Sequence, residues 1–397
     1  MVPRMQNPGG RFNGPTFFSR TLDIEKSQVV PHIHESGRCV ASGSGNTGVW
    51  RSCVDHLREA CSVNAIPHLL TPVRSGKVES VDDLVLQCPR CRQCAGTISR
   101  SHAPERADLI CATCLITLRL RRGIWNALLP EREAYFAKFL DNYEAIRSAE
   151  GRGSSDSAFY LALPDKDLSG KNEEQWKIRR RTFQCLETEI IGPIASRVAR
   201  GLDILDLGAG NAWLSYRAAL RGHRPVAVDL IDNDFDGLCA AQHYRQRIPG
   251  MFPRVRAEFD YLPFSMDQFD VVIFNASFHY SEDYARTLSE ALRCVRRPGW
   301  IVIADTAWYR HESQGEEMLR ERAAIFTDRF GTASNALNSR EFLTDERLQA
   351  LEQSYGLRWQ RFDPQYGIRW RMRPFIAKLR GRREPSRFRI YVAEVTR

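Results

Sequence analysis

Short apolar runs alternate with amphipathic segments through the second half of this chain. We expect strands at residues 202–207, 225–229, 254–259, 269–275, 300–305 and 387–395, and helices at 212–220, 235–245 and 284–295. Buried strands that alternate with helical segments are typical of a parallel sheet with helices on both faces. The pattern therefore predicts a doubly wound α/β domain over residues 201–397, in which the helical stretch 312–354 forms a lid or substrate wall.

The first half of the chain has a different pattern. Residues 1–83 are rich in Gly, Ser, Pro and Asn and show no lasting periodicity, so we expect a low-complexity, disordered extension. Residues 84–130 hold paired cysteines between short apolar runs. Residues 131–200 have helical spacing, mainly over 131–149 and 173–198, and predict a helical cap or linker.

A glycine turn follows the first strand of the α/β domain. Asp206 precedes Gly208 and Gly210, and glycine allows positive φ and the close approach of a ligand. A dinucleotide fingerprint needs a third glycine, but Trp213 stands at that position. An acid-led turn of this kind suits a ligand with an ammonium group and no pyrophosphate. Asp229 ends the second strand, where a carboxylate can accept both ribose hydroxyls.

Four motifs in order carry a family resemblance. They are Asp206-Leu-Gly-Ala-Gly210, Val228-Asp229, Glu258 with Leu262-Pro-Phe264, and Phe269-Asp-Val-Val-Ile-Phe-Asn275. From about residue 200 onward, the chain resembles the class I S-adenosylmethionine (SAM)-dependent methyltransferases, and most closely their broad type 11 group. The resemblance implies a Rossmann-like, mostly parallel, seven-stranded sheet and an enzyme that transfers a methyl group from SAM.

The same resemblance implies a set of cofactor contacts. They are Asp206, Gly208, Ala209, Gly210, Asn211, Asp229, Leu230, Glu258, Phe259 and Asn275. In this assignment Asp206 and the amides of the glycine turn hold the methionine part. Asp229 holds the ribose, and Leu230, Glu258 and Phe259 surround the adenine. Asn275 lies beneath the transferred methyl.

Further candidates lie outside the motifs. In the methyltransferases that the chain resembles, the segment before the glycine turn caps the cofactor, so Tyr160, Trp176 and Arg179 are candidates to cover the methionine end. Arg179 could bind the cofactor carboxylate through its fork of donors; the alternative is that all three are ordinary core or surface residues. His279 is a candidate general base for an acceptor that must lose a proton, or it has no chemical part.

The cysteines favour a metal site. Cys88-Pro-Arg-Cys91 and Cys111-Ala-Thr-Cys114 have the spacing of a tetrahedral structural zinc site, in which four thiolates leave no open position. Cys94 could replace Cys88 or Cys91, and we expect it to be a bystander. The span 86–130 resembles the zinc ribbons of activator subunits of tRNA and translation-factor methyltransferases. That resemblance implies a structural or docking role.

Charge is concentrated at one end of the chain. The net charge is +9, and residues 369–397 contain ten Lys or Arg and two Glu. This segment is either a solvated helix face or a surface that attracts phosphate, an acidic partner or, as a peripheral contact, anionic lipid. No apolar run is long enough to span a bilayer, and the N-terminus lacks a signal pattern, so we expect a cytoplasmic protein.

The leading functional hypothesis is methyl transfer to a small-molecule, lipid or glycan acceptor. One alternative is an RNA base methyltransferase whose zinc ribbon recognises RNA; against it, the ribbon lacks aromatics interleaved with basic residues. Another alternative is a regulator that binds SAM without turnover. The sequence leaves the acceptor and the oligomeric state open.

Overall fold

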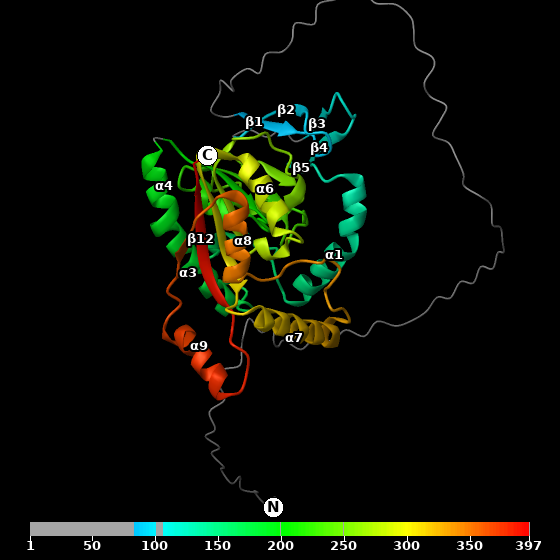
Figure 1. The fold of residues 1–397 in the computed structure, drawn as a ribbon. Coiled ribbons are helices and arrows are strands. Elements are labelled where there is room, and N and C mark those ends of the chain that lie inside the picture. Colours follow the sequence, from blue (N-terminus) through cyan, green and yellow to red (C-terminus); the bar gives the residue numbers. More distant parts are fainter. Residues whose placement is uncertain (1–82, 101–105, 199, 249, 397) are drawn as a thin grey trace, which may run out of the picture. The chain divides into compact units, whose positions relative to one another are not determined.

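A ten-stranded sheet lies at the centre of the computed structural model, in the order β11-β12-β10-β9-β6-β7-β8-β5-β4-β3 (Figure 1). The strands are β3 (Ala107–Ile110), β4 (Thr117–Arg121), β5 (Ile124–Asn126), β6 (Asp203–Leu207), β7 (Arg224–Asp229), β8 (Arg254–Arg256), β9 (Phe269–Asn275), β10 (Val295–Trp308), β11 (Trp359–Phe362) and β12 (Arg387–Val395). The structure describes residues 83–100, 106–198, 200–248 and 250–396. The predicted extension 1–83 therefore lies outside the described residues, apart from its last one.

Seven of these strands form the predicted doubly wound core. Strands β8, β7, β6, β9 and β10 are parallel neighbours, and β12 runs antiparallel to β10. Strand β11, which the sequence pattern did not predict, pairs with β12 at the edge. The mostly parallel sheet is thus confirmed, and the last strand of the chain lies inside it.

Alternate residues of the core strands bury their side chains on opposite faces. Leu205 of β6 belongs to a cluster that includes Leu288 of α6 (Tyr284–Cys294), whereas Ile204 belongs to a second cluster with Phe183 of α3 (Glu173–Leu186). Every residue of β6 is buried. Helices therefore cover both faces, which explains why these strands are apolar throughout.

The core has the predicted seven strands, and three further strands from the cysteine segment extend the sheet to ten. Strand β5 pairs in parallel with β8, and β4 and β3 continue the sheet in antiparallel fashion. Without them β8 would be an edge strand with unpaired backbone groups. The first two strands of the segment, β1 (Asp83–Gln87) and β2 (Cys94–Ser99), form a separate antiparallel pair. The predicted border at residue 130 therefore does not separate two sheets.

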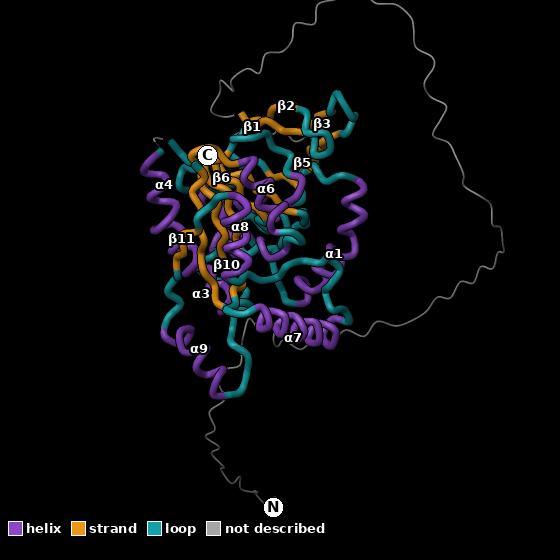
Figure 2. Tube along the Cα trace, viewed as in Figure 1, coloured by secondary structure: helices purple, strands orange, loops and turns teal. Residues whose placement is uncertain are grey.

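Helices surround the sheet and follow most of the predicted ranges (Figure 2). The others are α1 (Pro130–Ala149), α2 (Ser157–Ala162), α4 (Gly192–Arg197), α5 (Trp213–Ala219), α7 (Glu312–Phe330), α8 (Asp345–Tyr355) and α9 (Ile368–Leu379). A π-helical turn at Glu187–Ile191 divides the predicted helix 173–198, and the predicted helix 235–245 is a 3-10 helix at Leu238–Tyr244. Helix α9 was not predicted. Among the described residues, none of the helices combines the length and apolarity needed to cross a membrane.

Candidate active site

A cleft lies at the carboxyl ends of β6, β7 and β9 and encloses about 1060 Å³, including space open to solvent. Eleven of the predicted site residues line it: Arg179, Asp206, Gly208, Ala209, Gly210, Asn211, Asp229, Leu230, Glu258, Phe259 and Asn275. Carboxyl ends of neighbouring parallel strands meet at one edge of the sheet, and ligands of such sheets bind there. The motifs are therefore brought together by strand order.

The glycine turn requires glycine for two physical reasons. Gly208 has a φ of +73°, and a Cβ at this position would lie 2.2 Å from the Cβ of Ser277. Gly210 has a φ of +55°. Both positions are in the left-handed region that residues with a Cβ rarely adopt. The tight turn thus depends on positive φ and on close packing against the loop after β9.

The amides of the glycine turn already have protein acceptors. The N–H groups of Gly208 and Ala209 donate to the carbonyl of Val228, at 2.8 and 3.0 Å. The N–H of Gly210 donates to Oδ2 of Asp229 at 2.7 Å. These bonds attach the turn to the end of β7, so the amides do not form the predicted cradle for the methionine end. The side-chain carboxylates of Asp206 and Asp229 remain as polar groups on this side of the cleft.

Asp206, which is buried, and Asp229, which is partly buried, are carboxylates on the same cleft. Asp206 accepts a hydrogen bond from Ser215 at 2.8 Å, and Asp229 also accepts one from the amide of Ile231 at 2.9 Å. Burial raises the pKa of Asp229 to about 6. Burial, together with the charge of Asp229, raises the pKa of Asp206 to about 7. Two carboxylates that resist ionisation in this way favour a bound cation or hydroxyl donors.

Glu258 has an arginine partner that the sequence analysis missed. Nε and Nη2 of Arg132, near the start of α1, donate to the Glu258 carboxylate at 2.6 to 2.9 Å. Both residues line the cleft. A buried carboxylate implies a cation near it. Nothing in the spacing of the chain indicates which of the many arginines lies there.

Helix α1 also supplies an aromatic wall. Phe139 and Tyr143 lie on the cleft together with Tyr280, and their ring centroids are 5.7 to 6.1 Å apart. The sequence pattern predicted an apolar face on this helix but did not indicate that it faces the cleft. Arg147, one turn further on, forms an ion pair with Asp236 at 2.6 Å. This wall is thus apolar and aromatic, and the charge of Arg147 is neutralised by Asp236.

Of the three residues predicted to cap the cofactor, only Arg179 lines the cleft. Its guanidinium lies 5.0 Å from the ring centre of Trp176 and, within the described part of the chain, has no hydrogen bond or ion pair. Burial lowers its pKa to about 10, which leaves it charged at neutral pH. Trp176 is instead buried against Trp213, with ring centroids 6.0 Å apart.

Tyr160 and His279 are not brought into the cleft. The hydroxyl of the fully buried Tyr160 donates to the carbonyls of Ser154 and Phe235, at 2.8 and 2.7 Å, and thereby holds two loops together. His279 lies outside the cleft lining, and burial lowers its pKa to about 4. The side chain that reaches the cleft from this loop is the next one, Tyr280. The geometry therefore gives no support to His279 as a general base.

A family comparison agrees with this geometry. Residues 205–303 match the family model described as "Methyltransferase domain". The match runs from β6 to β10, and most of the predicted cofactor residues fall inside it.

Known proteins similar to the chain differ in what their names describe. Over 194 residues it is 27% identical to the human mitochondrial arginine-hydroxylase NDUFAF5, covering 47% of this chain and 51% of that protein. Over 142 residues it is 29% identical to the malonyl-[acyl-carrier protein] O-methyltransferase of Halorhodospira halophila, covering 35% of this chain and 45% of that protein. The chain thus spans about half the length of these relatives.

The comparison with solved structures includes another methyltransferase. It is the 1,6-didemethyltoxoflavin-N1-methyltransferase of Burkholderia thailandensis, with 15% identity and a TM-score of 0.39, covering 75% of this chain and all of that one. The names of these proteins specify different reactions and acceptors.

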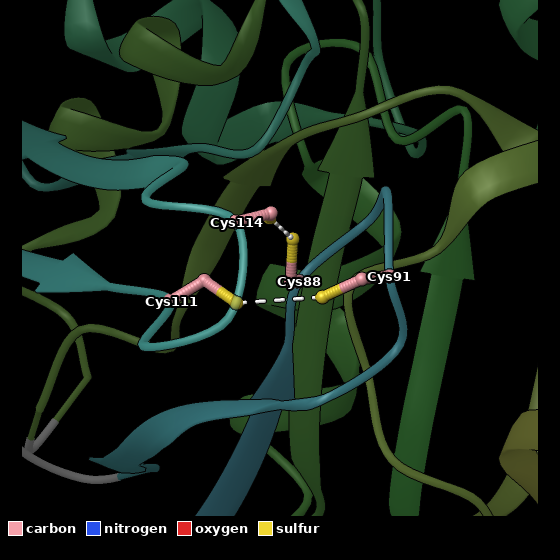
Figure 3. Close-up of side chains that lie close together, drawn as sticks. All are labelled: Cys88, Cys91, Cys111 and Cys114. Carbon is pink, nitrogen blue, oxygen red and sulfur yellow. Dashed lines mark hydrogen bonds between the residues drawn. The ribbon is translucent and has the colours of Figure 1, made fainter. Parts of the chain in front are cut away.

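The methyltransferase domain adjoins a cluster of four cysteines. Cys88 and Cys91 follow β1, Cys111 and Cys114 follow β3, and their sulfur atoms all lie within 4.8 Å of one another (Figure 3). The two turns have the same form. In each, the residue after the second cysteine has positive φ and donates its N–H to the carbonyl of the first cysteine, at 2.9 Å. Cys94, at the start of β2, is exposed and outside the cluster.

Proposed function

We propose that this protein is a SAM-dependent methyltransferase that binds its cofactor in the cleft. The observation that carries the proposal is that Asp206, Asp229 and Arg179 line one cleft. The charged side chains of the cleft suit the polar groups of SAM. Carboxylates suit the ammonium group and the ribose hydroxyls, and a guanidinium without an ion pair suits the carboxylate. Leu230 and Phe259 suit the faces of the adenine.

The proposed adenine end includes the pair of Glu258 and Arg132. A carboxylate held by two charged hydrogen bonds has a defined orientation, and its oxygens retain lone pairs for a further donor. Burial raises the pKa of Glu258, and Arg132 opposes that shift. We infer that Arg132 positions Glu258 as an ionised acceptor for the exocyclic amine of adenine.

When bound, SAM supplies an activated methyl group on a sulfonium centre. The protein must then align the acceptor with that methyl and exclude water. The aromatic wall of Phe139, Tyr143 and Tyr280 excludes water from the side of α1. Burial raises the pKa of both tyrosines, which keeps their phenols protonated at neutral pH. An acceptor that already has a free lone pair can attack the methyl without a base. For such an acceptor the protein only has to align the two groups.

The cysteine segment favours a small-molecule, lipid or glycan acceptor over RNA. An RNA-binding ribbon needs cations for phosphates. The cysteine segment instead directs Arg90, Arg121 and Arg122 to protein carboxylates, which are Glu131, Asp108 and Asp234. These exposed ion pairs leave little positive potential for a nucleic acid backbone. The cytoplasmic location stays a prediction.

We propose a structural zinc ion for the four cysteines. Zinc–sulfur bonds of ~2.3 Å in a tetrahedron put neighbouring sulfurs ~3.8 Å apart, a spacing that the cluster can adopt with small side-chain shifts. Four thiolates fill the coordination sphere, so the metal would stabilise the fold and take no part in methyl transfer.

Isothermal titration calorimetry with SAM tests the main proposal. The wild-type chain should bind SAM with one site per chain, and Asp229→Ala should weaken binding by about 100-fold or more, since it removes the carboxylate proposed to accept the ribose hydroxyls. Asp232→Ala is the matched control, because Asp232 is exposed three residues further on and does not line the cleft. Equal SAM affinity in wild type and Asp229→Ala would refute the assignment.

A further inference from the structure

We propose that α9 is an interfacial anchor that docks this protein onto the surface of an anionic phospholipid bilayer. The helix spans Ile368–Leu379, and none of its residues is buried. The cleft and the cysteine cluster do not use it. Its surface therefore needs a separate explanation.

The apolar residues of α9 form one exposed stripe. Ile368, Met372, Phe375 and Leu379 are spaced by four, three and four residues, which puts them on one face of a helix. Their exposed fractions are 69%, 41%, 57% and 72%. These four are a third of the twelve large exposed hydrophobic side chains among the described residues. Such a concentration marks an interaction surface.

The opposite face of α9 attaches the helix to the domain. Trp370 stacks on Phe388 of β12, with ring centroids 5.7 Å apart, and also contacts Tyr366. The Tyr366 hydroxyl lies 2.8 Å from Oγ1 of Thr182 in α3. Because Trp370 lies two residues from both Ile368 and Met372, it is on the far side of the helix from the stripe. The stripe therefore faces away from the sheet, and α9 stands apart from the strands in Figure 1.

Basic residues accompany the stripe. Helix α9 contains Arg369, Arg371, Arg373 and Lys378, has no acidic residue, and is followed by Arg380 and Arg382; the next residue, Arg383, is ion-paired with Glu321. Apolar side chains on one face with Lys and Arg beside them are the signature of helices that lie in the plane of a membrane surface. Arg and Lys gain from the negative potential of anionic lipids, while the apolar side chains enter the acyl boundary.

Two other partners, a second copy of the chain and a nucleic acid, fit this surface less well than a membrane does. A second copy would bring two strongly basic helices together, and like charges repel. A nucleic acid could neutralise the arginines but offers no apolar partner for side chains such as Ile368 and Leu379. An anionic bilayer complements both the charge and the apolar stripe.

The contacts that attach α9 to the domain lead to residues near the cleft. Thr182, which contacts Tyr366, also donates to Asp305, at the end of the core portion of β10. Arg179 of the cleft is on the same helix as Thr182. Docking through α9 would thus hold the cleft edge of the sheet near the bilayer. If the proposed function holds, this position favours a lipid-borne acceptor.

Vesicle flotation with the full chain tests the anchor. The protein should float with phosphatidylcholine vesicles that contain phosphatidylglycerol and remain behind with pure phosphatidylcholine, and raised salt should release it. The double variant Phe375→Ser/Leu379→Ser should bind at least about tenfold more weakly, because two large apolar side chains no longer enter the bilayer. Arg371→Gln/Lys378→Gln should weaken binding about tenfold through loss of two charges.

The matched control is Leu220→Ser/Met266→Ser, which removes two exposed apolar side chains elsewhere and should bind as wild type does. All four substituted apolar residues are exposed, so the variants should keep the wild-type unfolding temperature. The proposal fails if wild type ignores anionic vesicles or if the α9 variants bind unchanged. It also fails if sedimentation velocity shows a dimer that Phe375→Ser/Leu379→Ser dissociates, or if soluble polyglutamate binds α9 more tightly than vesicles do.

Discussion

The two walls of the cleft are assembled in different ways. The loop wall, with Asp206, Gly208 and Asp229, comes from two adjacent strands and the turn between them. The helix wall, with Arg132 and Tyr143 of α1, comes from far earlier in the chain and reaches the cleft because β5 joins the sheet beside β8. The difference suggests that cofactor binding depends on local backbone geometry, whereas the surroundings of the acceptor depend on how the cysteine segment docks.

The largest expected effect concerns the support of the helix wall. Cys111→Ser should remove one of four zinc ligands and lower the free energy of unfolding by about 3 kcal/mol or more. Because α1 starts four residues after β5, and Glu131 pairs with Arg90 between Cys88 and Cys91, we expect hydrogen exchange to rise in α1 before it rises in β6.

Cys94→Ser is the control for this test, because Cys94 is exposed and outside the cluster. It should retain about one zinc per chain by elemental analysis, as wild type should. A wild-type protein without zinc, or equal protection of α1 and β6 in Cys111→Ser, would contradict the distinction between the walls.

The next effect concerns the loop wall. Gly208→Ala should cost about 2–4 kcal/mol of stability and abolish SAM binding, because it combines positive φ with a Cβ that overlaps Ser277. Gly331→Ala is a matched control: it also has positive φ, at +68°, but no atom lies within 4 Å of its added Cβ. The control should lose only about 1 kcal/mol, measured by urea unfolding. Similar losses in both variants would show that close packing of the turn is unimportant.

A smaller effect should come from the contact between the walls. Arg132→Met leaves Glu258 buried without its cation, so SAM should bind about tenfold more weakly, as measured by calorimetry. Arg119→Met, on an exposed position of β4, is the control and should leave SAM affinity unchanged. If Arg132→Met matches this control, the helix wall does not take part in cofactor binding.

The last effect is the pH dependence of the loop wall. The pKa values of Asp206 and Asp229, about 7 and about 6, lie above the ordinary value of 3.8, so near pH 6 Asp206 is mostly protonated and Asp229 partly protonated in the free folded protein. Binding of a cationic ligand favours ionisation. SAM affinity should therefore rise by up to about tenfold per pH unit below these pKa values, and level off above pH ~7.5.

The same shifts have the opposite sign for the free protein. A carboxyl whose folded pKa is raised binds more protons in the folded than in the unfolded state, so its contribution to stability falls as pH rises from about 4 to about 7. Calorimetry in buffers of different ionisation enthalpy should show proton release on SAM binding, reduced in Asp206→Asn. An affinity that is flat between pH 5.5 and ~7.5 would contradict the burial of this pair.

Several features of this protein could be read from residues that lie near one another in the chain. The spacing of apolar residues predicted the core strands. The predicted ranges 269–275 and 387–395 agree with β9 and β12. The glycine turn, the acid at the end of β7 and the two cysteine pairs indicated groups that lie together, because residue spacing within a turn or a cysteine pair is a local property.

Only the tertiary structure decided the remaining features. The partnership of Arg132 with Glu258, the aromatic wall of α1 and the exclusion of His279 from the cleft all depend on contacts between segments far apart in the chain. The charge of residues 369–397 was visible in the sequence, but the outward direction of the α9 stripe follows from the packing of Trp370 on β12. Local patterns specify which side chains share a face of an element; long-range packing decides what that face meets.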